Sequence, residues 1–176
     1  TILYGLGAIK NVGSEAVSNL INEREKNGKF KSLMDFTKRV NPKDINKLQL
    51  EGLVKSGAFD KLEINRKGIF FSIPKLIQLN KVYYEDKVSK QSNLFDNDED
   101  SKNEKFKLIT NEKWDIKELL SEEFKSLGFY ISDHPLNNFK SIFSQLNIKP
   151  YKDYIVDQNN EGIIAGTLMS MQEKKS

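Results

Sequence analysis

Cysteine is absent from this 176-residue chain, and histidine occurs once, as His134. Without thiols the chain can form no disulfide framework, no thiolate zinc site and no cysteine nucleophile. A single histidine also excludes any site that needs two imidazoles. No apolar run approaches the roughly 18 residues of a membrane-spanning helix, and no basic-then-apolar start resembles a signal peptide. The chain begins at Thr1 rather than at methionine, so we expect a piece of a longer protein.

Charge is abundant and unevenly distributed. Lysine and arginine total 28 against 25 aspartates and glutamates, for a net charge of +3. Residues 1–90 carry 17 basic and 10 acidic side chains, whereas residues 91–176 carry 11 and 15. A basic first half is a weak indication of a polyanionic partner. An ordinary lysine-rich surface is the alternative, and charge alone favours that interpretation.

Apolar residues at helical spacing predict a mainly α-helical chain. The expected helices cover about 14–27, 32–41, 43–56, 66–88, 119–127 and 135–146. Ser32 is a suitable N-cap, and Gly28, Gly57 and Gly128 are suitable helix stops. Pro74 interrupts the fourth pattern and should mark a first turn or a kink.

Two segments depart from the helical pattern. Residues 89–105 are polar, with five acids against one lysine between Asp96 and Glu104, so we expect a disordered or extended linker. Residues 161–176 are apolar with glycine and threonine, which is typical of a strand. No partner strand is in view, so we expect the chain to end inside an unfinished β domain.

The first candidate site is the turn that leads into the first predicted helix. Its residues are Lys10, Asn11, Val12, Gly13, Ser14 and Glu15. A glycine turn at the positive end of a helix exposes backbone N–H groups that suit a phosphate oxygen, and Gly13 has no side chain to obstruct it. Such contacts carry no base information, so they indicate binding to a DNA backbone. The alternative is an ordinary helix start.

A similar turn follows the third predicted helix. It comprises Lys55, Ser56, Gly57 and Ala58. Two such turns in one helical unit are a more specific indication of binding to a DNA backbone than one turn. For the second turn alone, an ordinary glycine helix stop with Phe59 in the core is the preferred interpretation.

The third candidate site is a short peptide inside the acidic segment. Its residues are Gln91, Ser92, Asn93, Leu94 and Phe95. Leu94 and Phe95 are the only large apolar pair in this solvated stretch. Two adjacent anchors on a disordered peptide suit a hydrophobic pocket on a partner, with Gln91 hydrogen-bonding at its edge. The alternative is that the pair folds back onto its own domain.

The sequence offers no convincing catalytic or metal site. His134 lies at a predicted helix entry, where a structural role is the better interpretation. The acids from Asp96 to Asp100 lack the glycine and the closing glutamate of a calcium loop, so a solvated linker is the better interpretation. No phosphate-binding loop, nucleotide fingerprint or catalytic carboxylate pair is present.

Five blocks follow one another along nearly the whole chain: YGLGAIKNVGSEAV, FKSLMDFTKRV, LVKSGAFDKL, QSNLF and EEFKSLGFYISDHPL. In this order they resemble the C-terminal region of the C-family replicative DNA polymerases of bacteria, the polymerase III alpha subunits. Two positions depart from the family. Asn11 stands where helix-hairpin-helix motifs usually have a glycine, and Pro74 falls where relatives have continuous helix.

The resemblance implies five parts in a mainly α fold. Residues 1–60 would be a helix-hairpin-helix module that binds duplex DNA, 61–90 a helical extension, 91–113 an acidic linker whose residues 91–95 bind the β sliding clamp, 114–150 a helical segment, and 151–176 the truncated start of an OB-like domain. It places the catalytic palm upstream, so this chain would be non-catalytic and without a cofactor. The parent DNA-directed DNA polymerase would use Mg²⁺. Other replisome subunits as partners and a bacterial cytoplasmic location are further expectations.

The combined hypothesis is a non-catalytic part of a replicative polymerase, which binds the DNA backbone and is tethered by the clamp. Two alternatives stay open. One is the helix-hairpin-helix module of a repair nuclease, which needs an acidic metal site that the sequence does not show. The other is an interaction scaffold with no nucleic-acid role.

Overall fold

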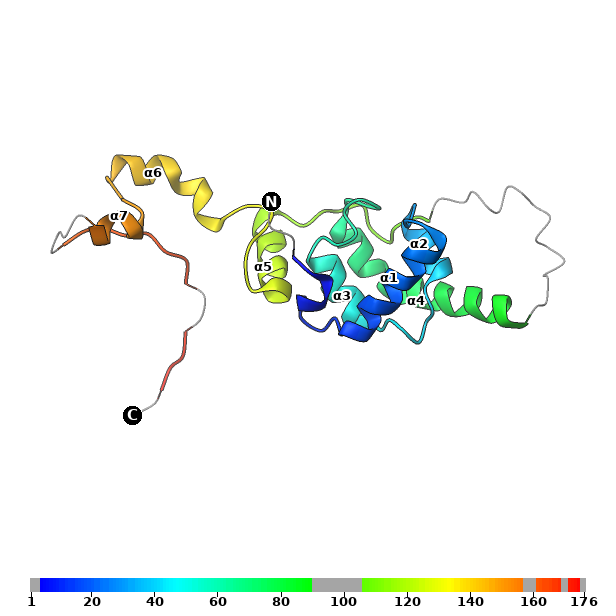
Figure 1. Ribbon diagram of the computed structural model, residues 1–176. Coiled ribbons are helices and arrows are strands. Elements are labelled where there is room, and N and C mark those ends of the chain that lie inside the picture. The colour runs from blue at the N-terminus through cyan, green and yellow to red at the C-terminus, as the bar shows by residue number, and fades with distance from the viewer. Residues whose placement is uncertain (1–3, 90–105, 157–160, 169–170, 175–176) are drawn as a thin grey trace. The chain divides into compact units, whose positions relative to one another are not determined.

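A computed structural model describes residues 4–89, 106–156, 161–168 and 171–174 (Figure 1). The chain forms two units, Thr1–Phe129 and Tyr130–Ser176. The first contains η1 (Leu6–Ala8, a 3-10 helix), α1 (Ser14–Asn27), α2 (Leu33–Arg39), α3 (Lys47–Lys55), α4 (Arg66–Ser89) and α5 (Ile116–Leu127). The second contains the 3-10 helix η3 (Pro135–Phe139), α6 (Lys140–Gln145) and α7 (Tyr151–Val156). The mainly helical prediction is confirmed.

Capping side chains explain where α2 and α3 begin. The Ser32 hydroxyl accepts a hydrogen bond from the Asp35 amide at 3.0 Å, as predicted for the start of α2. Asn46 and Gln49 form a reciprocal capping box at the start of α3. Because this box fixes the first turn, α3 begins later than the predicted range of 43–56.

Glycines end two of the helices as predicted. Gly28 follows α1 with φ of 80°, and Gly128 follows α5 with φ of 82°. Both values lie in the left-handed region that a residue without a Cβ adopts at little cost. At its other end α5 begins with a capping box between Asp115 and Glu118.

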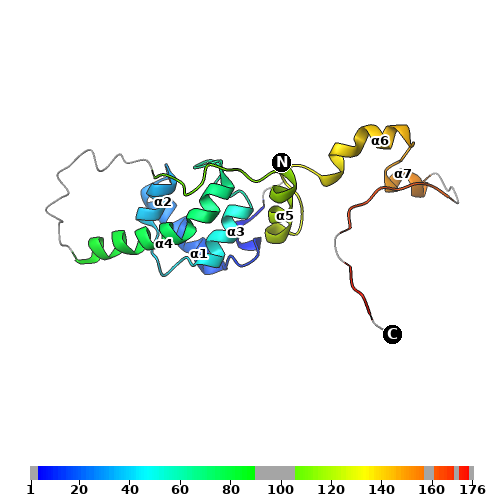
Figure 2. The same ribbon diagram turned by 180° about the vertical axis from the view of Figure 1, so that it is seen from behind.

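The core of the first unit lies where α2 and α3 pack against α4, an arrangement visible from both sides (Figures 1 and 2). Its most buried apolar side chains, each at most 2 % exposed, are Leu53, Val54, Ile69 and Ile73. The buried amide of Asn80 donates to the carbonyl oxygens of Thr37 and Val40, both at 2.7 Å. Asn80 therefore satisfies backbone acceptors at the end of α2.

Pro74 lies inside α4, and the helix continues through it. It does not mark a first turn, which was one of the two predicted outcomes. Proline removes one backbone donor from a helix, but Ile73 and Leu76 beside it are buried in the core. This tertiary packing outweighs the local cost.

Residues 106–114 return to α4 and pack against it. The Ile109 amide donates to the Ser72 hydroxyl at 3.0 Å. The side chain of Leu108 lies so close to Gly68 that a Cβ there would be 2.6 Å from it. Residues 106–113, which the resemblance would include in an acidic linker, are therefore part of the first unit.

The described residues of the second unit do not include the predicted strand. Residues 161–168 and 171–174 have no regular structure, and α7 covers Tyr151–Val156. A strand needs a neighbour for its N–H and C=O groups, and the described residues provide none. An OB-like start at 151–176 thus stays a prediction.

Candidate nucleic-acid interface

The first predicted turn connects η1 to α1 and is anchored by two apolar side chains. Ile9 and Val12 are 4 % and 5 % exposed, whereas Lys10, Asn11 and Gly13 are exposed. Asn11 has φ of 68°, a left-handed conformation that asparagine adopts more readily than most residues. Asparagine therefore replaces the usual glycine without breaking the turn.

Helix α1 begins without a side-chain cap. Its N-cap residue is Gly13, and no side chain of the described residues accepts from the first-turn amides. The amides of Gly13, Ser14 and Glu15 find no acceptor within the described parts of the chain. Unsatisfied donors at the positive end of a helix are suited to an anion.

Gly13 is not required by the fold. Its φ is −72°, which any residue adopts, and an added Cβ would meet nothing closer than Gln49 Nε2 at 3.9 Å. The missing side chain instead leaves open space directly beside the free amides. This geometry fits the prediction that a phosphate approaches the backbone here.

The other side of the first turn rests on α3 and α5. The Lys10 amide donates to the Ser126 carbonyl oxygen at 2.9 Å, so of Lys10 only the exposed side chain is available to a ligand. A Cβ on Gly52 of α3 would lie 2.8 Å from the Lys10 carbonyl oxygen. This role of Gly52 was not predicted, although a glycine inside a helical pattern is a signal of close backbone approach.

The second predicted turn has no free main-chain donors. The amides of Ser56, Gly57 and Ala58 donate to the carbonyl oxygens of Gly52, Val54 and Leu53 at 3.0, 3.1 and 3.0 Å. With Gly57 at φ of 80°, this is a Schellman helix end. These amides are therefore not available to a phosphate, although the turn was listed as a second candidate site. The structure fits the ordinary glycine helix stop that the sequence favoured for this turn alone, with Phe59 buried.

The charged groups around the second turn are also paired. Lys55 Nζ lies 2.9 Å from Glu122 Oε2, and Arg66 bonds to Asp60 and Glu123. Burial raises the pKa of Glu122, but hydrogen bonds from Lys125 and Lys55 outweigh it and hold this pKa below the ordinary range. Glu122 therefore stays ionised and keeps its lysine partners.

Two candidates from the sequence remain, the peptide Gln91–Phe95 and His134. The peptide Gln91–Phe95 lies outside the described residues. His134 Nδ1 accepts from the Leu136 amide at 3.2 Å and caps η3, which confirms its predicted structural role. Across the described ranges, no cluster of three or more histidines and acids is placed to hold a metal ion. Among the same residues, no helix is long and apolar enough to cross a bilayer.

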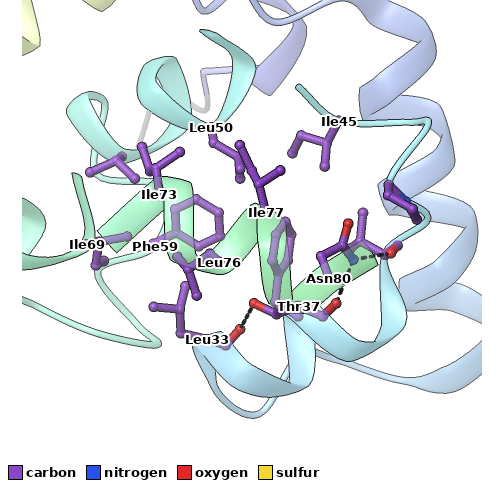
Figure 3. Close-up of a pocket in the computed structure, with 14 residues that line it drawn as sticks. Leu33, Thr37, Ile45, Leu50, Phe59, Ile69, Ile73, Leu76, Ile77 and Asn80 are labelled. Atoms are coloured by element: carbon purple, nitrogen blue, oxygen red, sulfur yellow. Dashed lines mark hydrogen bonds between the residues drawn. The ribbon is translucent and has the colours of Figure 1, made fainter. Parts of the chain in front are cut away.

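A pocket in the first unit is a packing defect of the core (Figure 3). Its volume is about 20 Å³, enough for roughly one water molecule. The side chains around it come mostly from α2, α3 and α4, and Asn80 and Thr37 supply its polar groups (Figure 3). It is therefore too small for a substrate.

Comparison with known proteins agrees with this geometry. Residues 1–69 match a family described as "Helix-hairpin-helix motif". The whole chain aligns with the DNA polymerase III subunit alpha of Rickettsia bellii at 37% identity and with that of Rickettsia prowazekii at 36%. In Borreliella burgdorferi the same subunit is 44% identical over 84% of the chain. This chain is homologous to a segment of DNA polymerase III alpha subunits.

The predicted resemblance is thereby confirmed, and its extent is defined. The chain spans 15% of the length of each Rickettsia alpha subunit and 13% of the Borreliella one. The helix-hairpin-helix match ends near the start of α4, whereas the similarity to the alpha subunits continues through α5 and the second unit.

Proposed function

We propose that this chain binds the sugar–phosphate backbone of duplex DNA during replication, as part of a DNA polymerase III alpha subunit. The observation that carries the proposal is the uncapped start of α1, where the amides of Gly13, Ser14 and Glu15 have no acceptor within the described residues. The helix-hairpin-helix match over residues 1–69 includes this turn and supports the assignment.

The proposed contact combines two kinds of donor. Backbone amides and the helix dipole hold one phosphate, and the exposed Lys10 ammonium adds an ion pair with the same strand. Neither group reads a base edge, so affinity should be independent of sequence. The chain contributes binding and no catalytic step; nucleotidyl transfer and its Mg²⁺ are assigned to other parts of the subunit.

Fluorescence anisotropy of the full chain with labelled duplexes tests this function. Two duplexes of unrelated sequence should bind with the same Kd, and affinity should fall as salt rises because bound phosphates release counterions. Binding that is absent or insensitive to salt would leave the turn as a packing element only.

We further propose that Gln91–Phe95 docks on a β sliding clamp. Leu94 and Phe95 would fill a hydrophobic pocket, and the surrounding acidic residues keep the peptide soluble. The variant Leu94→Ala/Phe95→Ala should lose clamp binding in a pull-down with the full chain. The control variant Asp98→Asn/Asp100→Asn keeps both anchors and should bind like the parent, and equal binding by the double-alanine variant would refute the assignment.

A further inference from the structure

The main-chain and side-chain donors of the second turn are occupied by groups of this chain. Its three amides are engaged in the helix end, and the Lys55 ammonium lies 5.0 Å from the centre of the Phe70 ring as well as beside Glu122. Arg66 covers the outer side of Gly57, where an added Cβ would collide with Nη2 of the guanidinium. A phosphate approaching this turn would have to displace Arg66.

The cationic side chains of Lys55, in the second turn, and Arg66, beside it, bind α5 instead of a ligand. Arg66 donates two hydrogen bonds to the Asp60 carboxylate, at 2.8 and 2.6 Å. It also donates one from Nη1 to Glu123 Oε1 at 2.8 Å. The Glu123 side chain is 0 % exposed and that of Arg66 only 10 %. Loss of either partner would leave a buried charge uncompensated, so the pair fixes where α5 sits.

Helix α5 in turn supports the first turn. The Ser126 carbonyl oxygen, near the end of α5, accepts the hydrogen bond of the Lys10 amide at 2.9 Å. Helices α3 and α5 lie side by side in both views (Figures 1 and 2). A continuous set of contacts therefore runs from the second turn, through α5, to the first turn.

We propose that the second turn is a packing site for α5 rather than a second nucleic-acid contact. In this proposal Lys55 and Arg66 hold α5 in place, and α5 in turn positions the first turn. The consequence for DNA rests on the proposed function. The packing of α5 itself does not, because it concerns only contacts within this chain.

The variant Lys55→Gln of the full chain separates the two roles. Its ion pair with Glu122 is partly exposed, so the variant should remain folded. If Lys55 positions α5, hydrogen exchange of the Lys10 amide becomes about fivefold faster, because local opening costs less free energy. The slope of log affinity for duplex DNA against log salt then stays the same. If Lys55 instead contacts a phosphate, the slope becomes shallower by about 0.9 while Lys10 exchange is unchanged; that result would overturn the proposal.

Three further variants complete the experiment. Glu122→Gln removes the same contact from the α5 side and should reproduce the faster Lys10 exchange; unchanged exchange in both variants would also overturn the proposal. Lys117→Gln, at an exposed α5 position without an ion pair among the described residues, should change neither readout. Lys10→Gln should make the salt slope shallower by about 0.9. If it does not, the proposed function fails, and the packing of α5 is still decided by the exchange data.

Discussion

Two glycines on opposite sides of the first turn are present for different physical reasons. Gly13 has an ordinary φ and open space around its Cα, so the fold tolerates a side chain there. Gly52 is buried in α3, and an added Cβ would lie 2.8 Å from the Lys10 carbonyl oxygen. We therefore attribute Gly13 to ligand binding and Gly52 to backbone packing, and each attribution predicts a different outcome of substitution.

Replacing Gly13 by serine should separate stability from binding. Serine is a better N-cap than glycine, so the free energy of unfolding should rise by a few tenths of a kcal/mol. Its hydroxyl would take a first-turn amide and occupy the phosphate approach, so duplex affinity should fall about tenfold, the loss of one charge-assisted hydrogen bond. Urea unfolding and anisotropy measure the two effects.

Ser32→Ala is the matched control and should show the opposite pattern. It removes the side-chain cap of α2, which lowers stability by about 1 kcal/mol, and it leaves the first turn intact. Duplex affinity should be unchanged. If Gly13→Ser binds DNA as tightly as the parent, the first turn is not the phosphate site.

Replacing Gly52 by alanine should destabilise the chain although alanine is the better helix former. Helix propensity alone predicts a gain of about 1 kcal/mol. The new Cβ would lie 2.8 Å from the Lys10 carbonyl oxygen, so overpacking should dominate and lower the free energy of unfolding by about 1–3 kcal/mol. Gly7→Ala, with no atom within 4 Å of its Cβ, should change stability little; a stabilised Gly52→Ala would contradict the close contact.

At the scale of elements, ion pairs join one helix to another. Arg39 at the end of α2 bonds to Glu23 of α1 at 2.8 Å and stacks over the Phe30 ring with its guanidinium carbon 4.5 Å from the centre. The hydrogen bond from Arg39 lowers the pKa of Glu23, and this effect exceeds the rise caused by burial. A second hydrogen bond, from Asn27, lowers the pKa further. The pairs between α1 and α2 and between α3 and α5 therefore depend on ionised glutamates.

These lowered pKa values predict loss of stability in acid. A carboxyl group with a lower pKa when folded takes up protons first in the unfolded state, so stability falls as pH drops through the folded pKa. The thermal midpoint should be level between about pH 7 and pH 5 and fall below roughly pH 4.3, the ordinary pKa of glutamate. Differential scanning calorimetry of Glu23→Gln should show a lower midpoint at neutral pH and a weaker acid dependence. Glu25→Gln, at an exposed position of the same helix, should behave like the parent.

Local signals predicted the elements well, and long-range contacts account for what was missed. Ser32, Gly28 and Gly128 are near their helix ends, so sequence alone places α1, α2 and the end of α5. The ion pair between Arg66 and Glu123 beside the second turn was not predictable, because the two residues meet across a long sequence separation and both residue types are usually exposed. The same applies to the Ser126 carbonyl that takes the Lys10 amide.

At the scale of the whole molecule, the segment carrying the proposed clamp motif is an insertion within one unit. Ser89 and Phe106, on either side of it, both belong to the unit Thr1–Phe129. A contact with a clamp through this insertion would therefore hold the first turn near the DNA that the clamp encircles. Linking two weak contacts in this way raises overall affinity without any new contact.

This arrangement predicts avidity on clamp-loaded DNA. The full chain should leave DNA carrying a loaded β clamp at least tenfold more slowly than bare DNA, a modest gain for two linked contacts. Either Gly13→Ser or Leu94→Ala/Phe95→Ala should remove most of this difference. Surface plasmon resonance measures the dissociation rates, and equal rates for the parent chain on both DNAs would show that the two sites do not act together.

The most direct test of the central claim is an amide NMR titration of the full chain with a short DNA duplex. The account predicts that the largest chemical-shift changes fall on the amides of Gly13, Ser14 and Glu15, and that those of Ser56, Gly57 and Ala58 stay in place. Shifts concentrated at the second turn, or none at the start of α1 when the duplex is bound, would contradict it.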